Sequence, residues 1–310
     1  MHVAIVGMGA LGRVYGVRLA ANGAADVTFV VRSARATPRL SITRVDGDGT
    51  TLDLTAPGIT THIPDTADVA IVCVRVEQLD AALDEVLDAV RSIPIVVLTP
   101  LLPHDFDRLV KRHGTRLLAA MPGVVSYITT DGGCRYWLPK VAPTLIEQTT
   151  PESPVVTELV QALRAGGLPA RVEPGVRETN PATTISFIPL AMGIDAAGTI
   201  DALLDDRALL RLSLDAVTEG LALASRVGTA PPWVGMLARF VGPMTLRIGI
   251  GLARSRSPEA LRYVDDHFGR KLHPQNVVMA RAIVALAREK GTASVALEKL
   301  SARLDAVPVA

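Results

Sequence analysis

Three glycines near the start of the chain have a spacing that can hold a phosphate group. They belong to a GxGxxG motif made of Gly7, Met8, Gly9, Ala10, Leu11 and Gly12. An apolar run typical of a buried strand, residues 3–6, precedes the motif, and helical periodicity over residues 11–22 follows it. In such a unit the glycines permit a tight turn and close approach to a diphosphate, and the helix N-terminus offers N–H groups. We therefore expect these six residues to bind a dinucleotide.

The end of the second predicted strand, residues 27–31, indicates which dinucleotide is bound. An acidic residue at this position accepts a hydrogen bond from the ribose 2′-hydroxyl of NAD, whereas an Arg binds the 2′-phosphate of NADP. Here the strand is followed by Arg32 and Ser33, with Arg35 close behind and no acid. A guanidinium can pair bidentately with a phosphate, and the Ser hydroxyl adds a donor, so the pattern predicts NADPH. The alternative is that Arg32 is an ordinary solvated side chain.

The elements that must position these residues alternate between strand and helix. Further buried strands are predicted at 69–74 and 95–98, with a helix between them carrying the apolar stripe Leu79, Leu83, Val86, Leu87 and Val90. This alternation implies a parallel sheet with right-handed crossovers. Residues 38–63 resemble an inserted antiparallel stretch. Strands are also expected within 117–128 and 141–148 and near 170–173, with a helix near 155–165.

Beyond about Gly175 helical periodicity dominates. The expected helices cover residues 181–197, 205–227, 233–252, 258–268 and 274–290. The predicted fold class is therefore α/β: a Rossmann-type dinucleotide-binding domain over residues 1–175, followed by an all-α domain over residues 176–310. We expect the second domain to serve substrate binding and dimerisation.

The bulk composition excludes several classes of partner. A net charge of +1 suggests neither nucleic acid nor an anionic membrane as a partner. The most apolar of the long stretches, residues 233–252, contains Arg239, Arg247 and Pro243, so we expect no membrane span. The two cysteines, Cys73 and Cys134, have no CxxC spacing, so neither a zinc site nor a disulfide framework is expected. With no signal peptide visible, a cytoplasmic protein is expected.

With these motifs the chain resembles the ketopantoate reductases, a family of two-domain NADPH enzymes. The resemblance rests on the glycine motif, on Arg32 and on four further segments: residues 129–133, 159–163, 166–168 and 273–276. It extends over nearly the whole chain in layout, but its specific motifs lie in the first domain. It implies a Rossmann domain, a helical domain and an active site in the cleft between them. The family also has a Lys after the third strand, and Arg75 stands at the matching position.

The catalytic residues of that family are not matched. Its members use a Lys early in the helical domain as the general acid, and no Lys occurs here between Lys140 and Lys271. The matching stretch runs from Asn180 to Thr184, and neither Asn nor Thr can supply the charge of an ammonium. The family also has Asn-Gly where this chain has Thr99 and Pro100, and the whole chain has only three Asn. We therefore expect a substrate other than ketopantoate.

Three residues are candidate catalytic groups in place of that Lys. They are Thr183 in the matching stretch, Asp195 on an otherwise apolar helix, and His267 in the segment 263–267, where an adjacent carboxylate could orient the imidazole. A buried carboxylate has a raised pKa and marks a functional candidate, although an Arg partner from the next helix would explain Asp195 equally well. The segment 263–267 is equally typical of a solvated helix end.

An apolar stripe in the second half could shape the substrate site. Its members recur at helical spacing: Trp233, Met236, Leu237, Phe240, Met244 and Ile248. They could line a pocket for a large apolar ligand, or they could belong to a core or a dimer interface.

Three hypotheses about function follow. The first is an NADPH-dependent oxidoreductase of biosynthesis, a homodimer that acts on a carbonyl or imine substrate more apolar than ketopantoate. The second is a non-redox enzyme on the same fold that cyclises or rearranges an apolar intermediate, with NADPH bound structurally or lost. The third is a non-catalytic binding module. The glycines and Arg32 favour the first hypothesis, and the missing Lys and amides favour the second.

Overall fold

The chain divides into two compact units. The computed structural model describes residues 1–21, 23–33, 37–47, 49–87, 92–129, 131–140, 142–229, 242–256, 261, 263–265 and 267–307. The first unit consists of residues 1–100 and 104–177, and the second of residues 101–103 and 178–310. The roles expected for the two domains stay predictions.

The first unit is built on an eight-stranded sheet with the order β12-β11-β8-β7-β6-β1-β2-β5. Its strands are β1 (His2–Val6), β2 (Asp26–Val30), β5 (Gly58–Thr60), β6 (Val69–Val72), β7 (Ile95–Val97), β8 (Leu117–Met121), β11 (Thr144–Glu147) and β12 (Ala170–Glu173). Six of them, from β8 to β5, pair in parallel, and β11 pairs antiparallel to β8. The central strands are apolar because both of their faces are covered.

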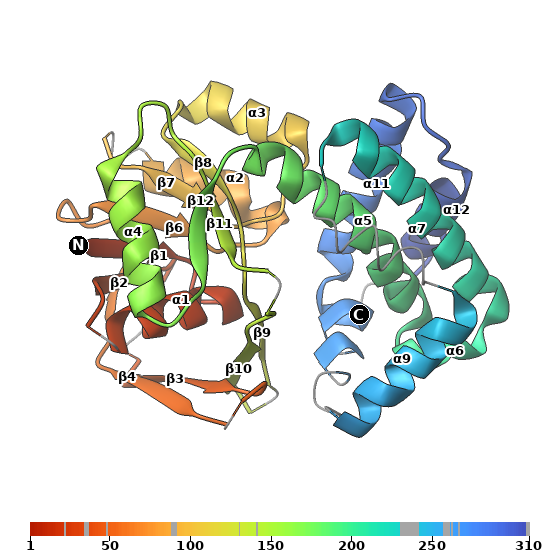
Figure 1. The fold of residues 1–310 in the computed structure, drawn as a ribbon, viewed down its shortest axis with the longest axis horizontal. Coiled ribbons are helices and arrows are strands. Elements are labelled where there is room, and N and C mark those ends of the chain that lie inside the picture. Colours follow the sequence, from red (N-terminus) through yellow and green to blue (C-terminus); the bar gives the residue numbers. More distant parts are fainter. Residues whose placement is uncertain are drawn as a thin grey trace. The chain divides into compact units, whose positions relative to one another are not determined.

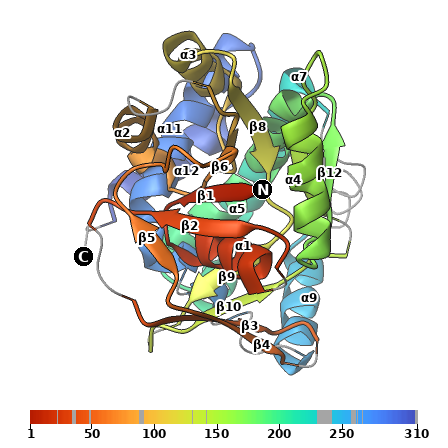
Figure 2. The same cartoon turned by 90° about the vertical axis from the view of Figure 1, so that its left-hand side faces the viewer.

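Four helices cover this sheet: α1 (Ala10–Ala21), α2 (Val76–Leu87), α3 (Pro103–His113) and α4 (Pro154–Ala165). Figures 1 and 2 show α1 and α4 on one face and α2 and α3 on the other. The chain leaves β1 toward β2 on one side and returns to β6 on the other, so the strand order reverses between β1 and β6. In sheets of this kind ligands bind outside the carboxyl ends of the strands at this reversal.

A second sheet packs against α1 from the other side. It has the order β4-β3-β10-β9 and is made of β3 (Arg39–Arg44), β4 (Thr51–Thr55), β9 (Val125–Ile128) and β10 (Cys134–Trp137). Helix α1 contacts strands of both sheets. The antiparallel pairing expected within residues 38–63 holds for β3 and β4, but β5 joins the main sheet in parallel with β2.

The second unit is helical in its described part. Its helices are α5 (Val176–Ala197), which begins in the first unit, α6 (Ile200–Asp205), α7 (Arg207–Val227), α9 (Pro243–Arg256), the π-helical turn η1 (His267–Lys271), α11 (His273–Glu289) and α12 (Val295–Asp305). One apolar core joins Ile194, Ile200, Leu203, Leu204 and Leu210. Among the described residues no helix is long and apolar enough to cross a membrane.

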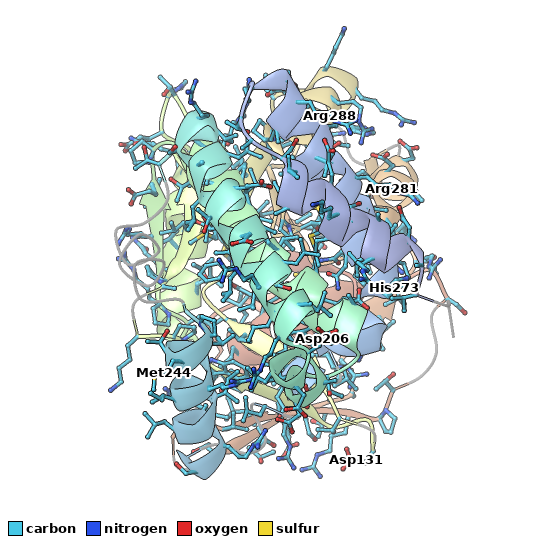
Figure 3. All side chains as sticks on the ribbon, turned by 90° about the vertical axis from the view of Figure 1, so that its right-hand side faces the viewer. Asp131, Asp206, Met244, His273, Arg281 and Arg288 are labelled. Carbon is cyan, nitrogen blue, oxygen red and sulfur yellow. The ribbon has the colours of Figure 1, made fainter. Side chains whose placement is uncertain are left out.

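The helix predicted over residues 205–227 is confirmed as α7, except that α7 begins two residues later, after Asp206. The backbone of Asp206 is extended, and its carboxylate accepts hydrogen bonds from the N–H groups of Ala208 and Leu209 at 3.0 and 2.9 Å. This is an N-cap, so Asp206 ends α6 and begins α7. Figure 3 shows the residue at the start of α7. Much of the helix expected at 233–252, and of the one expected at 258–268, lies outside the described residues.

Candidate functional site

The glycine motif forms the turn between β1 and α1, and its three glycines have different surroundings. Gly7 has a φ of +99°, and its N–H donates to the carbonyl of Val30 at 3.0 Å. A Cβ on Gly12 would lie 2.0 Å from the carbonyl oxygen of Gly7. A Cβ on Gly9 would meet no atom within 4 Å, and Gly9 is exposed. Gly7 and Gly12 are therefore required by the fold, whereas the space beside Gly9 is open to a ligand.

The N-terminus of α1 points its N–H groups out of this turn. The first hydrogen bond of the helix runs from the N–H of Arg13 to the carbonyl of Gly9, at 2.9 Å. The N–H groups of Ala10, Leu11 and Gly12 precede it and so have no carbonyl of their own helix to bind. They lie at the positive end of the helix dipole, which is the arrangement that binds phosphate in other proteins.

Arg13 holds the turn from its far side. Its Nε donates to the carbonyl of Met8 at 3.3 Å, and its NH1 donates to the carbonyl of Gly132 at 3.1 Å. These bonds tie the glycine turn to the loop between β9 and β10. Sequence reasoning did not single out Arg13, and its place directly after the motif is the only local signal that marked it.

Arg32 and Ser33 follow β2 at the same edge of the sheet, and both are exposed. Arg32 makes no ion pair with any described residue, so its guanidinium stays available to an anion. The neighbouring Val31 is fixed by a hydrogen bond from its N–H to the carbonyl of Thr60 at 2.9 Å. Arg35 lies outside the described residues.

The ends of β6 and β7 complete this carboxyl edge. The N–H of Cys73 donates to the carbonyl of Val6 at 2.8 Å, and the hydroxyl of Thr99 donates to the carbonyl of Val74 at 2.6 Å. Arg75 also lies here, but its Nε pairs with Glu77 Oε1 at 3.0 Å. Burial raises the pKa of the Cys73 thiol, so this cysteine is a packing residue and not a thiolate. Of Arg32 and Arg75, Arg32 is thus the one without an ion pair to a described residue.

In the second unit Asp195 is buried together with two polar side chains of α11. His273 Nδ1 lies 3.1 Å from each carboxylate oxygen, and Asn276 Nδ2 donates to Oδ2 at 2.9 Å. Burial raises the pKa of Asp195, and the two hydrogen bonds oppose the rise. The partners of the carboxylate are thus an imidazole and an amide and not the Arg that the sequence left open. Whether Asp195 is catalytic stays a prediction.

Thr183 makes a local contact. Its hydroxyl donates to the carbonyl of Thr179, one turn earlier in α5, at 2.7 Å. Thr184 similarly faces Asn180 Oδ1 at 3.4 Å. The hydroxyl proton of Thr183 is therefore held by its own helix, which weakens but does not test its candidacy as a catalytic residue.

The segment 263–267 has a structural function in its described part. Asp265 Oδ1 accepts a hydrogen bond from the N–H of Ile200 at 2.7 Å, at the start of α6. The side chain of His267 and residue Asp266 lie outside what the structure describes. The first four members of the apolar stripe, residues 233–240, also lie outside it, whereas Met244 and Ile248 are 76% and 55% exposed.

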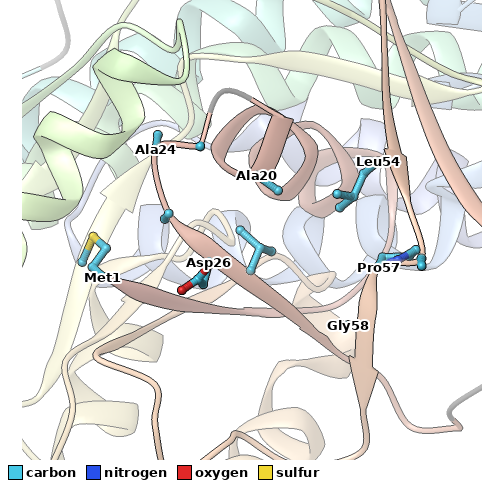
Figure 4. A pocket seen from close by; sticks show the side chains of 11 residues that line it. Met1, Ala20, Ala24, Asp26, Leu54, Pro57 and Gly58 are labelled. Carbon is cyan, nitrogen blue, oxygen red and sulfur yellow. The ribbon is translucent and has the colours of Figure 1, made fainter.

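A pocket of about 370 Å³ lies at the opposite edge of the main sheet. It is lined by residues that include Met1, Ala24, Asp26 and Gly58, at the amino ends of β1, β2 and β5 (Figure 4). Its walls bring together small side chains and one carboxylate, and it lacks the glycine turn and the Arg of the carboxyl edge. In the described residues no group of His, Cys, Asp or Glu side chains is arranged to hold a metal.

Comparisons with known proteins agree with the fold. Residues 3–100 match the model of the family described as ketopantoate reductase PanE/ApbA, which is about a third of the chain. No curated protein sequence matches the chain. A PanE/ApbA family ketopantoate reductase from Ralstonia eutropha JMP134 has a similar structure, with 18% identity, a TM-score of 0.70, and 98% of this chain and 97% of that chain covered.

Two further structures extend the comparison. The 2-dehydropantoate 2-reductase from Geobacter metallireducens GS-15 is 18% identical with a TM-score of 0.70, covering 98% of this chain and 99% of that chain. A D-mandelate dehydrogenase solved with NADH and anilino(oxo)acetate is 14% identical with a TM-score of 0.67, covering 99% and 98%. At these identities the structures establish a shared fold: a Rossmann-like sheet followed by a helical region.

Proposed function

We propose that this protein is an NADPH-dependent oxidoreductase, similar to ketopantoate reductase, that reduces a carbonyl or imine substrate more hydrophobic than ketopantoate. The observation that carries the proposal is the open space beside Gly9 at the N-terminus of α1, next to the exposed Arg32 at the end of β2. The match of residues 3–100 to the ketopantoate reductase family supports it.

The residues of the carboxyl edge fit NADPH. The missing Cβ of Gly9 leaves room for a diphosphate, which the N–H groups at the start of α1 would bind. Arg32 and Ser33 would hold the 2′-phosphate, and Arg75 would add positive charge from the end of β6. Arg13 and Thr99 would keep the surrounding loops in place through their bonds to backbone carbonyls. When bound, the coenzyme would supply a hydride to the substrate.

The second candidate function is a non-redox reaction on the same fold, a cyclisation or rearrangement with NADPH bound structurally or lost. It is favoured by one observation, the lack of any Lys between Lys140 and Lys271. Reduction of a ketone needs a proton donor, which contributes about 10²–10⁴-fold in rate. The two functions differ in whether product formation consumes the coenzyme, so absorbance of the reduced nicotinamide during turnover separates them.

Arg32→Ala tests the choice of coenzyme. Because Arg32 would contact only the 2′-phosphate, NADPH should bind about tenfold or more weakly to the variant, while NADH binding stays within about twofold. Calorimetric titration measures both. The matched control is Arg171→Ala, an exposed Arg on β12 that pairs with Glu173 at the far edge of the same sheet. Equal losses for the two coenzymes, or equal effects of the two variants, would remove Arg32 from the site.

The expected setting is a homodimer in the cytoplasm. Both cysteines are free, which suits a reducing compartment. A stripe of Met244, Ile248 and Leu252 on α9 is exposed and could contribute to a dimer interface. Sedimentation analysis of the purified protein tests the oligomeric state.

A further inference from the structure

Arg13 joins the glycine turn to the loop between β9 and β10, and both of its partners are backbone carbonyls. Its Nε donates to the carbonyl of Met8 at 3.3 Å, and a terminal nitrogen of its guanidinium donates to the carbonyl of Gly132 at 3.1 Å. Arg13 makes no ion pair with a carboxylate in the part of the chain that the structure describes. Its positive charge is therefore not neutralised, and it adds to the positive end of the α1 dipole.

The loop that holds the far end of Arg13 is fixed by its own hydrogen bonds. The N–H of Thr129 donates to the carbonyl of Gly133 at 2.8 Å, and the N–H of Gly132 donates to the carbonyl of Thr129 at 2.9 Å. Asp131 Oδ1 accepts a hydrogen bond from the N–H of Gly133 at 3.2 Å. The carboxylate of this loop is thus bound within the loop, and the carbonyl of Gly132 is the group that contacts Arg13.

The start of β10 is also fixed against the first turn of α1. Cys134 is buried, and its Sγ donates to the carbonyl of Ala10 at 3.6 Å. Burial raises the pKa of the Cys134 thiol to about 12, and the nearby charge of Arg13 opposes that rise. The thiol therefore keeps its hydrogen as a donor, and the hairpin of β9 and β10 gives Arg13 a firm support.

The bond from Arg13 determines the direction of one N–H group in the turn. In a trans peptide the C=O and the N–H point in opposite directions. Because Arg13 binds the carbonyl of Met8 on one side of the Met8–Gly9 peptide, the N–H of Gly9 points away from the guanidinium. That N–H has no backbone acceptor among the described residues, and the space beside Gly9 is open. It therefore joins the free N–H groups of the first turn of α1 as a donor to an anion.

The Met8–Gly9 peptide needs such a restraint because one of its neighbours is a glycine. Glycine adopts positive and negative φ about equally well, so the side chain at position 9 does not set the orientation of the peptide. Rotation of this peptide would put the carbonyl oxygen of Met8 where the N–H of Gly9 lies. A carbonyl oxygen repels a diphosphate, whereas an N–H binds it. The described contact that opposes the rotation is the bond from Arg13 Nε to Met8.

We propose that Arg13 is the positioning residue of the diphosphate subsite: held by Gly132, it keeps the Met8–Gly9 peptide in the orientation that offers the N–H of Gly9 to the diphosphate. The inference rests on the proposed function, because the diphosphate is that of the coenzyme. NADPH and NADH share this group. Arg13 therefore contributes to the affinity for both coenzymes, whereas Arg32 distinguishes between them.

The first test is calorimetric titration of Arg13→Gln with both coenzymes. The Kd values for NADPH and NADH should rise by the same factor, about tenfold or more, and their ratio should stay within about twofold of wild type. The matched control is Arg164→Gln, because Arg164 Nε also donates to a backbone carbonyl, that of Ala170 on the edge strand β12, at 2.7 Å. This control should leave both Kd values unchanged.

Arg13→Lys separates orientation from charge. The Lys ammonium keeps the positive charge but lacks the planar fork that reaches two carbonyls in fixed directions, so it should recover only part of the affinity. Affinities within about twofold of wild type in Arg13→Lys would show that charge alone acts here, and they would overturn the orientation role. If Arg13→Gln does not fold, Arg13→Lys takes its place and should show the same changes at smaller size.

The second test observes the N–H of Gly9 directly. In protein labelled with ¹⁵N-glycine, with the Gly9 signal assigned through Gly9→Ala, the probe ADP should shift the Gly9 amide proton downfield as its diphosphate accepts the hydrogen bond. Arg13→Gln should show a much smaller shift, even where its melting temperature equals that of wild type. An unmoved Gly9 signal in wild type, or equal shifts in the two proteins, would overturn the proposal.

The two tests distinguish failure of the inference from failure of the proposed function. If the wild-type protein binds neither NADPH nor NADH, the proposed redox function fails, and the Gly9 signal with ADP still decides whether the turn takes a diphosphate with the help of Arg13. If wild type binds both coenzymes and Arg13→Gln binds them equally well, the proposed function stands and Arg13 has no part in the subsite.

Discussion

Gly9 differs from Gly7 and Gly12 because no neighbouring atom in the described structure requires a glycine at its position. Gly7 needs its positive φ, and Gly12 lies against the carbonyl of Gly7. Gly9 faces open space, so the fold itself does not require a glycine there, and the proposed coenzyme would occupy that space. This contrast separates glycines that the fold requires from the one that a ligand would require.

Gly9→Ala should therefore leave the fold intact and weaken coenzyme binding. We expect the melting temperature to stay within about 2 °C of wild type, and NADPH affinity to fall by about tenfold or more because the methyl group occupies the diphosphate space. Gly12→Ala should instead lower the melting temperature by about 4–8 °C, since its Cβ meets a backbone oxygen. Thermal melts and calorimetric titration measure the two effects. Unchanged NADPH binding by Gly9→Ala would contradict this account of the turn.

Residues of the glycine turn could be predicted from the sequence because the pattern is local and each glycine has a steric role. The contact between His273 and Asp195 could not be predicted, because Asp195 lies 78 residues earlier in the chain. Only the packing of α5 against α11 joins them. The sequence marked Asp195 as an unexpected carboxylate on an apolar helix, but no sequence pattern pointed to His273 as its partner.

At the scale of elements, α5 and α7 approach closely at two glycines. Pro189 has no N–H to give to the carbonyl of Ile185, and Gly220 of α7 lies against that carbonyl, with its Cβ position 2.9 Å from the oxygen. Gly193 of α5 similarly faces Ser213, whose Oγ would lie 2.2 Å from a Cβ. Helix α7 thus packs directly against the carbonyl of Ile185, which receives no helical hydrogen bond from Pro189.

Gly193→Ala should destabilise the second unit by about 1–3 kcal/mol through overpacking. Ser213→Ala removes the closest atom and should recover part of that loss in the double variant. Urea unfolding of both single variants and the double variant measures the coupling. Purely additive losses would show that the two helices do not meet as described.

Elements with a strong apolar pattern were predicted, and weakly patterned ones were missed. The strands β1, β6 and β7 are continuous apolar runs buried on both faces, so their residues alone indicate them. Helix α3 was missed because its described core contribution is only Phe106 and Leu109 among charged residues. Strand β10 was missed because four residues, Cys134–Trp137, carry too little periodicity, and α12 lay beyond the last predicted helix.

The stability of the whole molecule should depend on pH through a buried His. His113 Nε2 accepts or donates no hydrogen bond in the described structure and lies 3.6 Å from Asp84 Oδ1. Burial lowers the pKa of His113, and the nearby Asp84 carboxylate opposes that only in part. As the pH falls below about 6.5, His113 is protonated first in the unfolded chain. The free energy of unfolding therefore decreases from about pH 6.5 down to the lower pKa that His113 has in the folded protein.

His113→Gln should make the loss of stability between about pH 7 and pH 5 less steep. Melting temperatures between these two pH values measure the slope, with His104→Gln as the exposed control. Asp195 has a raised pKa and so acts with the opposite sign at lower pH, where its protonation favours the folded state. An unchanged slope in His113→Gln would mean that its imidazole titrates alike in the folded and unfolded chains.

The fold class as a whole could be predicted because α1, α2, α3 and α4 each separate two strands of the main sheet, and only helices follow β12 in the described residues. The identity of the substrate could not be predicted, because the candidate catalytic residues lie on separate elements, α5 and η1, whose packing no local sequence pattern predicts. The coenzyme could be predicted, because its predicted ligands belong to short local patterns directly after β1, β2 and β6.

The most direct test of the central claim is calorimetric titration of the wild-type protein with NADPH and, separately, with NADH. The account predicts saturable binding of NADPH with a Kd of about 1–100 µM and binding of NADH that is about tenfold or more weaker. Absence of binding heat with either coenzyme, at protein concentrations well above that range, would contradict it.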